Sequence, residues 1–147
     1  MQHFKAEIYE TTTGKSFPNY KTLPWSESEA ILDQLHSHLG FEGAMDDPYL
    51  LKQVGQARTQ VRAFHAKSPD FSLESLFNHL GVSPQKKVFL WWDETTGKEI
   101  DVINAQDVCR DFKFIWYPAS DDLDIFDDSF SWLITIDHEG NIEFLHT

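Results

Sequence analysis

The chain has 147 residues, of which 41% are hydrophobic and 14% aromatic. We therefore expect one domain, residues 1–147, with a sizeable core. The 24 acidic and 12 basic residues give a formal net charge of −12, which disfavours nucleic-acid binding and favours a basic partner. The same charge is also compatible with a simple role in keeping an aromatic-rich protein in solution.

The single cysteine and the apolar pattern indicate the cellular setting. Cys109 has no second cysteine with which to form an intrachain disulfide, so a reducing compartment is the natural one. The first ten residues lack the basic region and apolar run of a signal peptide. No apolar stretch approaches the roughly 20 residues that span a bilayer. We expect a cytoplasmic protein that does not enter a membrane.

The N-terminal region predicts a strand followed by a helix. Residues 3–9 alternate apolar and polar side chains, which predicts a short strand, and residues 10–15 read as a turn before an irregular, proline-containing linker. Ser26 and Glu29 then form the S-x-x-E pattern of a capping box, directly before apolar residues at helical spacing. A helix is therefore predicted over 26–39.

Two further helices are predicted in the first half of the chain. Asp47 followed by Pro48 is typical of a helix start, and the apolar spacing continues to Phe64. A third helix is predicted over 71–81. The second helix carries a basic face, which either faces solvent or docks against the acidic tail, within the fold or in a dimer. Its basic residues are Lys52, Arg58, Arg62 and Lys67.

Strand patterns dominate the second half. Five strands are predicted, over residues 87–93, 99–103, 113–117, 131–136 and 142–146. A turn at 94–98, one or two helical turns over 104–112 and a tight turn at 137–141 connect them. Helices followed by antiparallel strands predict an α+β fold, in which N-terminal helices pack on one face of a mainly antiparallel sheet formed largely by the C-terminal half.

No motif for catalysis or for a cofactor is present in the sequence. Gly14-Lys15-Ser16 resembles the end of a phosphate-binding loop, but Tyr9 stands where the motif needs its first glycine. The seven histidines lack the i, i+4 pairing of a zinc-binding helix. Cys109 lies among apolar residues and is interpreted as a buried structural thiol. We therefore predict no catalytic residue, no metal ligand and no cofactor.

The most conspicuous charge cluster lies on the predicted connection 118–131, where five aspartates alternate with apolar residues. Three interpretations remain open: a solvated connection between strands, a protein-recognition surface, or a cation site, although the EF-hand spacing is missing. For protein recognition, aromatic side chains would supply buried contact area and carboxylates would attract a basic partner. The candidate partner-binding residues are Tyr117, Ser120, Asp121, Asp122, Asp124, Phe126, Asp127, Asp128 and His138.

The last quarter of the chain carries a recognisable series of residues. The series reads W-Y-P-x-S-D-D, then S-x-x-W, then I-x-H-E-G, and comprises Trp116, Tyr117, Pro118, Ser120, Asp121, Asp122, Ser129, Trp132, Ile136, His138, Glu139 and Gly140. It resembles the C-terminal part of small, acidic bacterial proteins of the toxin-immunity type. The resemblance implies a cytosolic protein without catalytic activity that binds a cognate toxin tightly and blocks it.

The leading hypothesis is a non-enzymatic, cytoplasmic protein-binding domain, an immunity-type inhibitor whose acidic loop occludes a basic cleft of a toxin. One alternative is a metal-dependent hydrolase or metal-binding domain that uses the Asp121–Asp128 cluster and His138. Another is a structural subunit of a homo-oligomer, in which the basic helix of one copy meets the acidic tail of another.

Overall fold

The computed structural model describes residues 1–43, 47–92 and 99–147. Within these ranges seven strands form one sheet in the order β1-β4-β3-β5-β6-β7-β2, and every neighbouring pair is antiparallel. The strands are β1 (Tyr20–Thr22), β2 (Thr59–Gln60), β3 (Lys87–Trp92), β4 (Ile100–Asn104), β5 (Leu123–Phe126), β6 (Trp132–Ile136) and β7 (Ile142–His146). The predicted turn at 94–98 lies outside the described residues.

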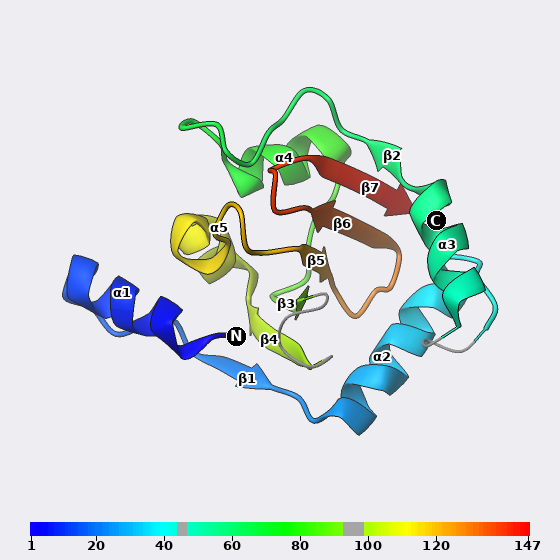
Figure 1. Ribbon diagram of the computed structural model, residues 1–147, viewed down its shortest axis with the longest axis horizontal. Helices are drawn as coiled ribbons and strands as arrows, with labels where there is room; N and C mark the ends of the chain where they lie inside the picture. Colours follow the sequence, from blue (N-terminus) through cyan, green and yellow to red (C-terminus); the bar gives the residue numbers. More distant parts are fainter. Residues whose placement is uncertain (44–46, 93–98) are drawn as a thin grey trace.

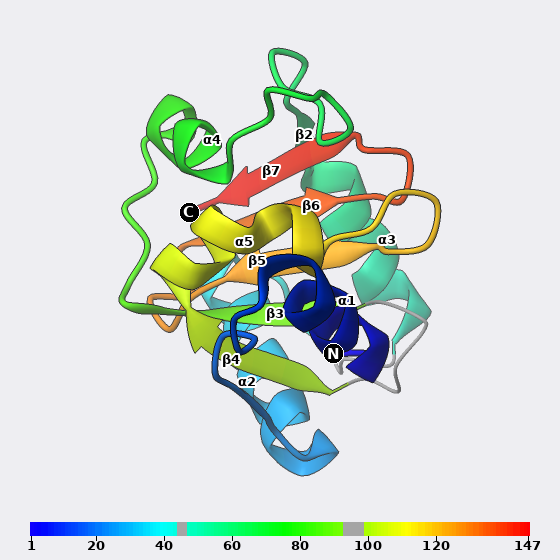
Figure 2. The same cartoon turned by 90° about the vertical axis from the view of Figure 1, so that its left-hand side faces the viewer.

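Five helices within the described ranges cover both faces of the sheet (Figure 1). They are α1 (His3–Thr13), α2 (Trp25–His38), α3 (Pro48–Ala57), α4 (Leu73–Leu80) and α5 (Ala105–Ile115). Figure 2 shows α1 and α5 in front of the sheet and α3 behind it. The α+β class is confirmed, but the helices lie on two faces and not on one. Apolar periodicity identifies a buried helix face without indicating which side of the sheet it covers.

Alternation along the central strands explains the two layers. In β5, Leu123 and Ile125 belong to the core under α1, α4 and α5, whereas Phe126 belongs to the core under α2 and α3. Successive side chains of a strand point to opposite faces, so Asp124 shares the face of Phe126. The strand is buried at all four positions, as expected for the middle of a sheet with helices on both sides.

Local sequence signals correctly predict three helices, with differences at their ends. Asp47 caps α3 by accepting a hydrogen bond from the Tyr49 backbone N–H at 2.9 Å, and α4 ends at Gly81 in the left-handed conformation, with φ 69°. α3 stops at Ala57 and not at Phe64, because the chain turns extended at its C-cap and pairs with β7 as β2. The capping box predicted for α2 is absent, since that helix begins one residue earlier, after a proline N-cap.

The prediction of a strand over residues 3–9 is wrong, since these residues form most of α1. The buried side chains of α1 are Lys5 and Tyr9, which are four residues apart and share one helical face. A buried lysine breaks the apolar pattern by which a helix is usually recognised. The alternating Phe4, Ala6 and Ile8 therefore suggested a strand, although Phe4 and Ile8 are exposed.

Two further corrections concern the C-terminal half. Residues 113–117 were predicted as a strand, but α5 extends to Ile115. Residues 123–126, assigned to the acidic loop, form β5 at the centre of the sheet. Charged residues beside this short run concealed its strand character. In the described part of the chain, no helix is both long and apolar enough to cross a membrane.

Candidate functional site

Asp121, a candidate partner-binding residue, is a buried structural group. One of its carboxylate oxygens accepts hydrogen bonds from the Lys5 ammonium at 2.6 Å and from the Tyr117 backbone N–H at 2.8 Å. The same ammonium donates to the Ile115 carbonyl at 2.7 Å and lies 3.9 Å from the centre of the Trp92 ring. Asp121 therefore joins α1 to the end of α5 and is not available to a partner.

Asp124 and Phe126 are also buried, because they lie within β5. The Asp124 carboxylate accepts a hydrogen bond from the Thr135 hydroxyl, and a guanidinium nitrogen of Arg58 lies 3.6 Å away. Burial raises the pKa of Asp124, while the positive charge of Arg58 opposes that rise. Phe126 is fully enclosed. Both residues were predicted to contact a partner. This prediction is wrong, because their position in β5 buries them.

Asp127 shapes the turn after β5. Its carboxylate accepts hydrogen bonds from the backbone N–H groups of Gln85 at 2.9 Å and Ser129 at 3.0 Å. The predicted acidic cluster is thus divided, and Asp122 and Asp128 are its only members that are not buried. They flank opposite ends of β5, a strand of 4 residues that spans about 13 Å at roughly 3.3 Å per residue. The predicted acidic loop is therefore wrong as a single surface.

Four predicted residues lie on two turns that run side by side in both ribbon views (Figures 1 and 2), whereas the exposed Asp128 lies at the other end of β5. The backbone N–H of Ala119 donates to the His138 carbonyl at 2.8 Å. The backbone N–H of His138 donates to the Asp122 carboxylate at 2.8 Å, and its ring nitrogen Nδ1 lies 2.9 Å from the same oxygen. These bonds bring Tyr117, Ser120, Asp122 and His138 together.

The contact between the two turns has two further features, an unusual backbone conformation at Ala119 and a raised pKa at His138. Ala119 adopts φ 70°, in the left-handed region that non-glycine residues rarely occupy. The hydrogen bond from its N–H helps to hold that strained conformation. The pKa of His138 is raised, first by its hydrogen bond to Asp122 and then by the charge of that carboxylate. Protonated His138 and ionised Asp122 therefore attract each other across the two turns.

Helix α1 adds an apolar area that the sequence did not indicate. Phe4 and Ile8 lie on one side of α1 and are 41% and 42% exposed, and the Phe4 ring centre lies 5.6 Å from that of Tyr117. The four-residue spacing of Phe4 and Ile8 could have indicated a shared helical face, but residues 3–9 were predicted to form a strand. We define the Tyr117 surface as Phe4, Ile8, Tyr117, Ser120, Asp122 and His138.

Acidic residues border the Tyr117 surface. Glu7 is exposed on α1 between Phe4 and Ile8, and Glu139 is exposed beside His138. Apolar side chains with a polar, charged rim are the usual composition of a protein-binding surface. Exposed apolar side chains that adjoin one another mark such sites more reliably than isolated ones.

The basic residues predicted on the second helix do not form one helical face. Arg58 lies at the end of α3 and turns inward to Asp124, within the same chain. Lys52 is exposed on α3, whereas Arg62 and Lys67 are exposed beyond its end. One part of the predicted docking between basic residues and the acidic tail therefore occurs inside the fold.

Within the described ranges, no group of side chains is arranged to bind a metal ion. No three or more histidine, cysteine, aspartate or glutamate side chains there are placed to hold a metal ion. Asp122 and His138 do meet, but Asp121, Asp124 and Asp127 point to separate hydrogen-bond partners. The alternative of a metal-dependent hydrolase would need these carboxylates to converge.

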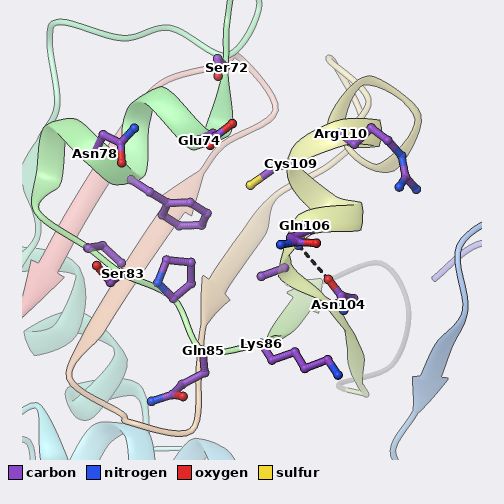
Figure 3. A pocket seen from close by; sticks show the side chains of 14 residues that line it. Ser72, Glu74, Asn78, Ser83, Gln85, Lys86, Asn104, Gln106, Cys109 and Arg110 are labelled. Carbon is purple, nitrogen blue, oxygen red and sulfur yellow. Dashed lines mark hydrogen bonds between the residues drawn. The ribbon is translucent and has the colours of Figure 1, made fainter.

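A cavity of about 940 Å³ lies between α4, the loop after it and α5 (Figure 3). The Cys109 sulfur points into the space between the two helices, whereas the Arg110 side chain points away. Burial and the nearby Glu74 carboxylate raise the pKa of the Cys109 thiol to about 11. The thiol is therefore protonated at neutral pH and is a poor nucleophile.

Comparison with family models, with curated proteins and with solved structures finds no match to this chain.

Proposed function

We propose that this chain is a non-enzymatic, cytoplasmic protein-binding domain, an immunity-type inhibitor that occludes a basic toxin through the Tyr117 surface. The observation that carries the proposal is the exposed pair Phe4 and Ile8, of which Phe4 adjoins Tyr117, with acidic residues nearby. The net charge of −12 supports a basic partner. The tail series that resembles immunity proteins supplies four of the six residues of this surface and one acidic neighbour, Glu139.

The proposed mechanism differs from occlusion by an acidic loop. Phe4, Ile8 and Tyr117 would contribute most of the buried contact area, because aromatic and aliphatic anchors dominate the energy of most interfaces. Asp122 and Glu139, at the rim, would speed association with a positively charged cleft and would be screened by salt. Helix α1 presents Phe4 and Ile8, and the left-handed turn at Ala119 follows Tyr117, so the anchors stand on a fixed backbone and less entropy is lost on binding.

A pair of substitutions tests the surface directly. The partner would be the basic effector encoded beside the gene for this chain, and affinity would be measured at low and high salt. Phe4→Glu with Ile8→Glu should weaken binding about 30-fold or more, the equivalent of losing an interface hot spot of about 2 kcal/mol. Tyr49→Glu is the matched control, because Tyr49 is 66% exposed on α3, across the sheet from α1.

The possible results of this binding experiment distinguish an error in the proposed surface from an error in the proposed inhibitor function. Strong binding that the Phe4 and Ile8 substitutions leave unchanged would remove the Tyr117 surface from the proposal. No binding to the neighbouring effector at any salt concentration would remove the inhibitor function. Self-association that the same two substitutions abolish would instead assign the surface to contacts between copies of this chain.

A further inference from the structure

The layer between the sheet and the helices α2 and α3 contains four polar side chains in addition to Ser28, whose hydroxyl donates to the Leu23 carbonyl at 3.3 Å and accepts from the Ile100 backbone N–H at 3.0 Å. His36 comes from α2, Arg58 from the end of α3, Trp91 from β3 and Asp124 from β5. His36, Trp91 and Asp124 are 3%, 7% and 4% exposed. The Arg58 side chain is 21% exposed, whereas the other three are enclosed by leucine, isoleucine, valine and aromatic side chains.

Strand register and charge link the four residues. Trp91 and Asp124 are direct partners in the pairing of β3 with β5, and side chains at such positions lie on one face with Cβ atoms about 5 Å apart. A guanidinium nitrogen of Arg58 lies 3.6 Å from the Asp124 carboxylate. Burial lowers the pKa of His36; the charge of Asp33 opposes that decrease and the charge of Arg58 adds to it. His36 is therefore neutral and within the electrostatic influence of Arg58.

Three nitrogens of this group have no hydrogen-bond partner within the described part of the chain: His36 Nδ1, Arg58 Nε and Trp91 Nε1. Buried polar atoms in native proteins almost always have a partner, from the protein or from ordered water. Two of these atoms belong to Arg58 and Trp91, which adjoin the Asp124 carboxylate, and the third belongs to His36, which is near Arg58; together they indicate a shared missing partner. The Arg58 guanidinium nitrogen is 3.6 Å from the Asp124 carboxylate, which is beyond direct hydrogen-bond distance, so this ion pair leaves hydrogen-bonding capacity on both groups.

We propose that this layer is an internal water-binding site, in which ordered water joins Trp91, Arg58 and His36 to Asp124. Water accepts hydrogen bonds from the indole and guanidinium N–H groups, and it donates to the carboxylate and to the neutral imidazole. A bound anion would be repelled by Asp124, and a bound cation by Arg58. A site with several polar partners is the kind that holds buried water.

The site lies across the sheet from the Tyr117 surface and does not depend on the proposed function. It explains how β5 can carry a fully buried carboxylate opposite a tryptophan. The hydrated layer replaces the hydrogen bonds that bulk water would supply, so Asp124 and Arg58 need not touch. Asp124 thus helps to attach α3 to the centre of the sheet.

Nuclear magnetic resonance of the wild-type protein tests the site directly. Cross-relaxation between water and indole protons would be measured for Trp91 and for Trp116, whose Nε1–H donates to the Asp121 carbonyl at 2.9 Å. We expect a long-lived water contact at the Trp91 indole proton and none at that of Trp116. A Trp91 indole proton without a water contact would overturn the proposal.

Substitution provides a second measurement. Trp91→Phe and Trp116→Phe both remove a buried indole N–H and reduce ring volume. If the Trp91 N–H is bonded to water, Trp91→Phe should lower the urea midpoint about as much as Trp116→Phe. A clearly smaller decrease for Trp91→Phe would mean that its N–H is unbonded in the folded protein, and this too would overturn the proposal.

Discussion

Replacing Lys5 with methionine should destabilise the protein strongly, although Lys5 contacts no part of the Tyr117 surface that we propose for binding except the tyrosine ring. The ammonium is 1% exposed and donates to Asp121 and to the Ile115 carbonyl. Burial lowers the pKa of Lys5, while the hydrogen bond and charge of Asp121 oppose that decrease. Lys5→Met keeps most of the side-chain volume but leaves the Asp121 carboxylate buried without its cation.

The magnitude follows from that uncompensated charge. Breaking a buried ion pair by removing one partner costs about 3–5 kcal/mol, which is a large share of the roughly 5–15 kcal/mol that stabilises a typical domain. At about 2–4 °C per kcal/mol for a chain of this size, the melting temperature should fall by roughly 10 °C. In Lys5→Met the Asp121 carboxylate still accepts a hydrogen bond from the backbone N–H of Tyr117. We therefore expect a cost at the lower end of the range of about 3–5 kcal/mol.

A double-mutant cycle in urea, followed by tryptophan fluorescence, measures the pair itself. The double variant Lys5→Met with Asp121→Asn carries no buried charge, so it should be more stable than Lys5→Met alone. The coupling between the two positions should exceed about 1 kcal/mol, as is usual for residues in one hydrogen-bond network. If Lys5→Met changed the free energy of unfolding by less than 1 kcal/mol, or if the two substitutions were additive, the reasoning would be refuted.

Three other predictions test the corrected placement of the acidic segment and the state of the cysteine. Phe126→Ala should cost about 3–5 kcal/mol in urea unfolding because the side chain is enclosed, whereas Asp128→Ala should change it by less than about 0.5 kcal/mol; equal effects would contradict the assignment of β5. In a proton NMR titration the pKa of His138 should lie above its ordinary value and fall in Asp122→Asn. Because the pKa of His138 is raised in the folded protein, the stabilisation from this pair is present below the ordinary pKa of histidine and is lost as pH rises through the pKa of folded His138. An unchanged His138 pKa in Asp122→Asn would disprove the contact. Alkylation of Cys109 by iodoacetamide should be slow at pH 7 and accelerate towards pH 11; a fast reaction at pH 7 would show an activated thiol.

Local signals in the sequence predict the elements whose cause is local. Asp47-Pro48 gives the start of α3, Ser72 caps α4 through the Ser75 backbone N–H, and Gly140 takes a positive φ of 93° in the turn between β6 and β7. Each of these depends on residues within a few positions of one another. The antiparallel hairpin of β6 and β7 was therefore readable from sequence.

Elements that depend on distant contacts could not be predicted in this way. Lys5 is tolerated inside α1 only because Asp121, 116 residues later, supplies its counter-charge. Asp124 is tolerated inside β5 because Arg58, which is distant in the sequence, lies 3.6 Å from its carboxylate. Sequence reasoning treats a charged residue as a sign of exposure, so both segments were misassigned, and the surface formed by α1 was missed with them.

The candidate site was predicted in part. Tyr117, Ser120, Asp122 and His138 were chosen because they lie near a charge cluster, and the two hydrogen-bonded turns bring them together. Asp121, Asp124, Phe126 and Asp127 were chosen for the same reason but are buried. The difference between the two groups depends on strand register, which alternates side chains between faces and is set by pairing with neighbours.

The edge strands of the sheet limit how another protein can bind to it. The outermost strands, β1 and β2, have three and two residues, and such short edges offer few free backbone groups to an incoming strand. We therefore do not expect a partner to bind by strand addition, a mode that needs a long open edge. The same short edges protect the protein from joining other copies of itself edge to edge, so recognition is left to the side chains of helices and turns.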